Sequence, residues 1–184
     1  LNTAATLATP GVVRVITAGD VRGTNRFGLM ESDQEVLVTD RIRGASDVVA
    51  VVVGTTEAAA RLGAGCLELE LVTETPLIDP ERACDEDAPV VHPGRTPTGS
   101  HPNIVTEQAI ARGDVDAAVA GAAIVISAEY RTELVEHAFL GPEAGIAVPE
   151  HDGTLTLNVA TQWPQEDLRQ AAEALLAEAN DPGL

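Results

Sequence analysis

The sequence has no lysine. All eleven basic residues among its 184 are arginine, and they face 29 aspartates and glutamates, which gives a net charge of −18. Without a side-chain amine, Schiff-base catalysis and the phosphate-binding lysines of nucleotide-dependent enzymes are excluded. The excess of negative charge repels phosphate backbones and anionic lipid headgroups. We therefore expect the chain to bind neither nucleic acid nor a membrane surface.

Aromatic residues and cysteines are also scarce. The four aromatic residues are Phe27, Tyr130, Phe139 and Trp163, too few for a stacking platform for bases or sugars. Cys66 and Cys84 lack the CxxC spacing of zinc and iron–sulfur sites. Reduced thiols are the preferred interpretation, and a disulfide between the two stays open. No apolar run is long enough to span a membrane, and the first ten residues do not resemble a secretory signal. Cytoplasm is the expected location.

The first half of the chain alternates short strand patterns with one helix. β-branched or alternating apolar runs predict strands at 12–17, 35–39, 47–53 and 67–72. Thr55 and Thr56 precede an alanine-rich helix that reaches Leu62. The helix stands between the last two predicted strands, so it is a crossover if those strands are parallel.

A proline-rich stretch from Pro76 to Pro102 separates this half from a second unit. That unit is predicted to hold a short helix at 113–120 and a long strand at 124–134. Asp152-Gly153 indicates a hairpin between runs at 146–149 and 154–160. A final helix is predicted at 164–180.

No catalytic set and no metal site are evident from the residues themselves. The four histidines, His92, His101, His137 and His151, form no metal-binding pair, and solvated loop positions are the preferred interpretation. There is no G-x-S-x-G elbow and no dinucleotide-binding glycine motif. Acidic pairs such as Glu133 and Glu136 are expected by chance among so many carboxylates. Gln162, between a strand end and a helix start, could offer an amide to an oxo or phosphate ligand, although bonding to nearby backbone is the simpler role.

Several segments, in order, resemble the large subunit of the molybdenum hydroxylases, the xanthine dehydrogenase and aldehyde oxidase family. They are GVVRVITAGDV at 11–21, NRFG at 25–28, DVVAVVVGTTEAAA at 47–60, ARGDVDAAVAGA at 111–122, YRTELVEHAFLGPEAG at 130–145 and ATQWPQEDLRQAAEAL at 160–175. The resemblance implies an α+β fold in which a hammerhead-type mixed sheet with a crossover helix is followed by a partial second α+β unit. It divides the chain into a partial α/β hammerhead domain at 1–92, a connector at 93–108 and the N-terminal part of a molybdopterin-binding domain at 109–184.

The resemblance also implies a function. Gln162 matches a glutamine that lies beside the molybdenum centre in the family, so it is the predicted cofactor-binding residue. The implied reaction is hydroxylation of an electron-poor carbon of a purine-like heterocycle or of an aldehyde, with water as the source of oxygen. The implied partners are the remaining large-subunit domains and iron–sulfur and FAD subunits or domains.

The sequence also departs from the family. We expect these 184 residues to lack counterparts of the family's first strands, glycine-rich pterin loop and general-base glutamate, and Gly141 stands where the family usually has Glu. We therefore expect a fragment that binds no cofactor alone, is inactive alone, and associates with itself or a partner through surfaces left uncovered. Two alternatives stay open: a non-catalytic scaffold or subunit-interaction module, and an unrelated acidic α/β binding domain.

Overall fold

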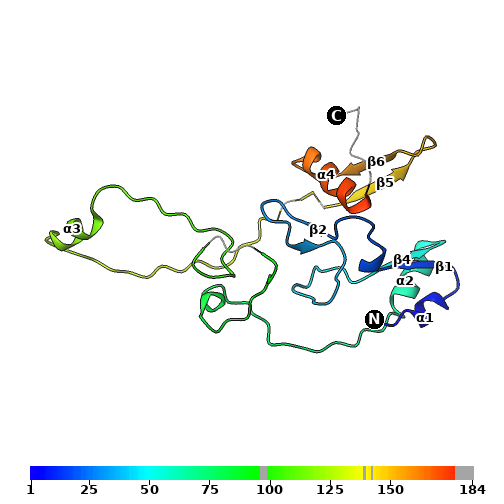
Figure 1. Ribbon diagram of the computed structural model, residues 1–184, viewed down its shortest axis with the longest axis horizontal. Coiled ribbons are helices and arrows are strands. Elements are labelled where there is room, and N and C mark those ends of the chain that lie inside the picture. Colours follow the sequence, from blue (N-terminus) through cyan, green and yellow to red (C-terminus); the bar gives the residue numbers. More distant parts are fainter. Residues whose placement is uncertain (96–98, 139, 142, 177–184) are drawn as a thin grey trace. The chain divides into compact units, whose positions relative to one another are not determined.

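The computed structural model describes residues 1–95, 99–138, 140–141 and 143–176. These residues form two compact units. The first contains residues 1–105 together with the described residues from Trp163 onward, and the second contains residues 106–162. Figure 1 shows the helices and strands along the chain. The division at 92 and 109 that the sequence suggested stays a prediction. No helix in the described part is long and apolar enough to cross a membrane.

The N-terminal part of the first unit is a two-stranded antiparallel sheet covered by two helices. Its elements are α1 (Ala4–Leu7), β1 (Val12–Ile16), β4 (Val51–Gly54) and α2 (Glu57–Ala64), and β1 pairs with β4 from Val12 opposite Gly54 to Ile16 opposite Val51. α2 begins at Thr56, whose side chain accepts a hydrogen bond from the Ala59 amide at 3.1 Å, as an N-cap does.

α1 and α2 meet at a buried contact without room for another atom. The Thr6 side chain is completely buried, and its hydroxyl donates to the Gly63 carbonyl at 3.0 Å. A Cβ at Gly63 would lie 2.5 Å from Cγ2 of Val12 and 3.2 Å from Cγ1 of Val52. The glycine therefore lets the helix pack directly on the sheet.

The rest of the first unit is mostly irregular chain. It contains the 3₁₀ turns η1 (Ala18–Asp20) and η2 (Arg82–Cys84), the short antiparallel pair β2 (Arg26–Phe27) and β3 (Gln34–Glu35), and helix α4 (Pro164–Leu175). The helix predicted at 164–180 is confirmed to Leu175 and ends there, because Leu176 adopts a left-handed backbone with φ of +52°. Residues 177–180 of that prediction lie outside the described residues.

The second unit contains α3 (Val115–Ala120) and a hairpin of β5 (Gly145–Pro149) and β6 (Leu155–Val159). The predicted turn is confirmed: Gly153 has a φ of +89°, and the Glu150 amide donates to the Thr154 carbonyl at 2.9 Å. The Asp114 side chain caps α3 by accepting from the Ala117 amide at 2.9 Å.

The α+β class is confirmed, since helices accompany three small sheets, each a two-stranded antiparallel pair among the described residues. Several predicted strands are wrong or too long. Residues 67–72 pair only through an isolated bridge between Asn2 and Glu68, so α2 is not followed by a paired strand. Residues 124–134 form no strand, and 35–39 and 47–53 shrink to Gln34–Glu35 and Val51–Gly54. An alternating pattern becomes a strand only where a neighbouring edge offers hydrogen bonds.

Candidate functional site

Gln162 lies in the short link between β6 and α4 and is solvent-exposed. Among the described residues, no hydrogen bond of its side-chain amide is formed, so the simpler role of satisfying nearby backbone is not seen. The backbone on either side is held. The Ala160 amide donates to the Ala144 carbonyl at 3.0 Å, and the Trp163 carbonyl accepts from the Glu166 and Asp167 amides at 3.1 and 3.2 Å. These two sets of bonds belong to different compact units, and the amide between them can donate to and accept from a ligand without adding charge.

The helix that follows Gln162 is attached to the loop at residues 23–28. The Gly23 and Thr24 amides donate to the carbonyls of Ala174 and Glu173, each at 3.0 Å. Carbonyls in the last turn of a helix lack full partners within the helix, so the loop supplies a donor to Ala174 and a second donor to Glu173, whose carbonyl also accepts from the Leu176 amide at 3.4 Å. A Cβ at position 23 would lie only 1.8 Å from the Glu173 oxygen, so this close approach requires glycine.

A second attachment uses a side chain of α4. The Gly28 amide donates to Oε1 of Gln170 at 3.1 Å, and Nε2 of Gln170 donates to Oε1 of Glu166 at 2.8 Å. Arg169 bonds to both Glu166 and Glu173. The bond from Arg169, helped by that from Gln170, lowers the pKa of the Glu166 carboxyl, and the two glutamates raise the pKa of Arg169. Glu166 is therefore kept charged and holds the Gln170 amide in place.

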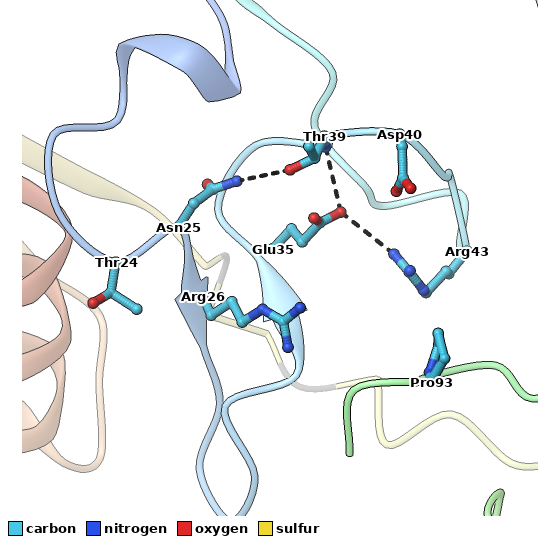
Figure 2. A pocket seen from close by; sticks show the side chains of 8 residues that line it. All are labelled: Thr24, Asn25, Arg26, Glu35, Thr39, Asp40, Arg43 and Pro93. Carbon is cyan, nitrogen blue, oxygen red and sulfur yellow. Dashed lines mark hydrogen bonds and ion pairs between the residues drawn. The ribbon is translucent and has the colours of Figure 1, made fainter.

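The other face of this loop borders a polar pocket of about 480 Å³, drawn in Figure 2. Nη1 of Arg43 lies 3.3 Å from Oε2 of Glu35, and Nε of Arg43 donates to the Val91 carbonyl at 3.0 Å. The lining residues are Thr24, Asn25, Arg26, Glu35, Thr39, Asp40, Arg43 and Pro93. Among these lining residues two arginines balance two acids, and serine, cysteine and histidine are not among them.

The histidines do not gather into a site. Nδ1 of His92 lies 3.8 Å from Asp33, which also pairs with the buried Arg95, and Nδ1 of His101 accepts from the Asn103 amide at 3.2 Å. His137 and His151 are exposed. The described residues contain no group of three or more His, Cys, Asp or Glu side chains that could hold a metal ion. Cys66 and Cys84 are both free thiols.

Sequence reasoning missed the attachment of α4 and the cluster of Asp33, His92 and Arg95. Gly23 and Gly28 stand in an irregular loop, and their partners lie about 140 to 150 residues further along the chain. The one available signal was the pair of glycines itself, which says only that the backbone there adopts an unusual conformation or approaches something closely.

Comparison with known proteins accounts for both parts of the chain. Residues 1–74 match the a/b hammerhead domain of aldehyde oxidase and xanthine dehydrogenase, and residues 97–181 match the molybdopterin cofactor-binding domain. The chain belongs to the aldehyde oxidase and xanthine dehydrogenase family.

Its relatives are much longer than the chain itself. The large molybdopterin subunit of nicotinate dehydrogenase from Eubacterium barkeri is 33% identical over 91% of this chain and 38% of its own length. A probable xanthine dehydrogenase subunit from Bacillus subtilis is 32% identical over 88% of this chain and 21% of its own length. The solved aldehyde oxidoreductase from Desulfovibrio gigas aligns with a TM-score of 0.81 and 25% identity, covering 97% of this chain and 20% of that one. The chain therefore spans between a fifth and two fifths of these proteins.

The loop and the helix lie in regions that match two different domains of the family. The loop at 23–28 lies in the region that matches the hammerhead domain, whereas Gln162 and α4 lie in the region that matches the molybdopterin domain. The hydrogen bonds from Gly23, Thr24 and Gly28 to α4 thus join the two family domains inside one compact unit.

Proposed function

We propose that this chain supplies one cofactor contact and part of the scaffold of a molybdenum hydroxylase large subunit. The observation that carries the proposal is the exposed amide of Gln162, which has no hydrogen-bond partner among the described residues and lies within the region matching the molybdopterin domain. An uncharged amide beside the start of a helix suits an oxo or pterin oxygen, because it donates a hydrogen bond without adding charge. The residue present therefore fits the group.

When bound, the molybdenum cofactor would supply the redox chemistry that hydroxylates an electron-poor carbon of a purine-like heterocycle or an aldehyde. The residues of this chain would bind and orient it: Gln162 through its amide, and Trp163 and α4 by fixing the backbone beside that amide. Neither a base nor a nucleophile is proposed here. The division into a hammerhead domain at 1–92, a connector at 93–108 and a molybdopterin domain from 109 belongs to the same proposal, as does a cytoplasmic location.

The chain is proposed to work only with partners. These are the remaining part of the large subunit and iron–sulfur and FAD subunits or domains, which would carry electrons away from the site. A single amide does not retain a large cofactor, so the 184-residue chain alone is proposed to be inactive. Stoichiometric molybdenum in the chain purified alone from a host that makes the cofactor would contradict this part of the proposal.

The role of Gln162 is tested in the chain assembled with the remainder of the large subunit and its partner subunits. We expect Gln162→Ala to lower the molybdenum and pterin content per large subunit, measured by elemental analysis and by pterin fluorescence after oxidation. Gln165→Ala is the matched control, because Gln165 is an exposed glutamine three residues away with no side-chain bond among the described residues. Equal cofactor content in both variants would overturn the assignment.

A scaffold or subunit-interaction module is the second candidate, and the apolar exposure of the second unit favours it. Ile126 and Leu134 are among several large apolar side chains between residues 124 and 134 that are almost fully exposed. The two functions differ in the assembled protein. A scaffold would keep its cofactor content and its activity when Gln162 is replaced, and would lose assembly when the apolar residues are replaced by acidic ones.

A further inference from the structure

The loop at residues 23–28 holds the C-terminal end of α4 at two places. One is the pair of backbone bonds from Gly23 and Thr24 to the last-turn carbonyls of Ala174 and Glu173. The other is the bond from the Gly28 amide to Gln170. Residues 170 and 174 are four apart and lie on one face of the helix, so the two attachments fix its rotation about its axis as well as its position.

Neither loop glycine has room for a side chain, Gly23 because of α4 and Gly28 because of the nearby Glu31 backbone. A Cβ at Gly23 would lie 1.8 Å from the Glu173 oxygen, and a Cβ at Gly28 would lie 1.9 Å from the Glu31 oxygen. Gly28 also has a φ of +157°, which residues with a side chain rarely adopt. The Gln170 side chain that accepts from Gly28 is also bonded to Glu166, which holds its amide in one orientation.

The opposite end of the same helix carries the proposed cofactor contact. α4 runs for twelve residues from Pro164, about 18 Å at the rise of an α-helix. Trp163 belongs to its first turn, since the Trp163 carbonyl accepts from the Glu166 and Asp167 amides, and Trp163 lies in the same compact unit as the loop. Gln162 is the next residue toward the N-terminus.

We propose that the 23–28 loop is a positioning element for Gln162. By capping and orienting α4, the loop of the hammerhead region sets where the Trp163 backbone lies, and the peptide bond between Trp163 and Gln162 passes that constraint to the backbone that carries the proposed cofactor contact. This inference rests on the proposed function of Gln162. Gly23, Gly28 and Gln170 act through the helix and touch no reacting atom.

The test uses Gly23→Ala in the 184-residue chain and reads out Trp163, the only tryptophan. Its indole gives one signal in a ¹H–¹⁵N spectrum and dominates the fluorescence. We expect Gly23→Ala to shift the Trp163 indole signal and the Gln162 side-chain amide signals, and to raise quenching of Trp163 by acrylamide. Gly19→Ala is the matched control, because a Cβ there would meet nothing closer than 3.9 Å, and it should leave all three unchanged.

A second variant distinguishes a change in the position of α4 from a general loss of folding. Gln170→Met removes the acceptor for the Gly28 amide together with the bond from Gln170 to Glu166, and it should move the same signals in the same direction by less. If either variant lowers the melting temperature but leaves the Trp163 and Gln162 signals of the folded chain in place, the loop only stabilises the helix and the proposal is overturned. The two proposals fail separately. Unchanged cofactor content in Gln162→Ala refutes the proposed function of Gln162. An unchanged Trp163 signal in Gly23→Ala refutes the positioning role of the loop, whatever the cofactor content.

Discussion

Asn25 shows how a single side chain can replace a strand partner. Its Oδ1 accepts from the Leu37 amide at 2.9 Å, and its Nδ2 donates to the Leu37 carbonyl at 2.7 Å. Leu37 is one of the few buried apolar residues, with 5% of its surface exposed. The amide thus satisfies both backbone groups of a buried residue that has no paired strand beside it.

Replacing Asn25 by alanine should destabilise the first unit. The Leu37 amide and carbonyl would both lose their partner in a buried position, which costs about 1–3 kcal/mol. The measurement is urea unfolding followed by circular dichroism. Asn158→Ala is the control, since Asn158 is exposed and its side chain makes no hydrogen bond among the described residues. Equal midpoints for the two variants would show that Asn25 does not hold Leu37.

At the scale of elements, the packing of α2 on the first sheet depends on Gly63. Alanine usually stabilises a helix interior relative to glycine by up to about 1 kcal/mol. At Gly63 the added methyl would meet Val12 at 2.5 Å, so we expect Gly63→Ala to lower the free energy of unfolding by about 1–3 kcal/mol instead. Gly65→Ala, just past the helix, meets nothing closer than 3.4 Å and should be neutral or stabilising. The melting temperatures of both variants test this prediction. A Gly63→Ala chain with a higher melting temperature than wild type would contradict the close packing of α2 on the sheet.

The stability that Glu166 adds to α4 should decrease in acid. Bonding to Arg169 lowers the pKa of Glu166 in the folded chain, so the unfolded chain binds a proton more readily. The contribution is fully present above the ordinary glutamate pKa, about 4, and is lost as pH falls through the lowered value. We expect wild type to be more stable than Glu166→Gln at neutral pH, with the difference vanishing in acid. The free energy of unfolding of both chains is measured at pH values from about 2 to about 7. A difference between the two chains that does not change with pH would refute the prediction.

The elements that the sequence predicted correctly are those with local signals. The β-branched run at Val12–Ile16, the Asp152-Gly153 turn and the proline at the start of α4 each specify their structure within a few residues. Residues 67–72 and 124–134 have equally clear alternation but find no paired edge among the described residues.

The candidate site shows the same limit. Gln162 came from a resemblance to known proteins, because nothing in the spacing around it distinguishes a ligand-binding amide from a structural one. The attachment of α4 to Gly23 and Gly28 depends on the tertiary approach of residues about 140 to 150 apart, and sequence spacing carries no information about such an approach.

At the scale of the whole molecule, exposed apolar surface and high charge oppose each other. Ile124, Ile126, Tyr130 and Leu134 lie in one irregular segment of the second unit, and all are at least 80% exposed. Seven arginines pair with carboxylates among the described residues. Acidic residues outnumber basic ones by 18, so most carboxylates have no arginine to pair with. The exposed apolar side chains favour association, whereas the charge repels one copy from another.

We therefore expect the chain to associate with itself, and more strongly as salt rises. Raising ionic strength from about 0.01 M to about 0.15 M shortens the screening length from about 30 Å to about 8 Å, which weakens repulsion between copies and leaves apolar contacts intact. Light scattering should show a larger mass at the higher salt. Ile126→Glu should reduce that mass and the binding of a hydrophobic dye, while Val72→Glu, at a position 94% exposed in the first unit, controls for the added charge. A monomer at both salt concentrations without dye binding would mean that the 124–134 segment is not an association surface, whereas association weakened equally by both variants would mean that charge alone governs it.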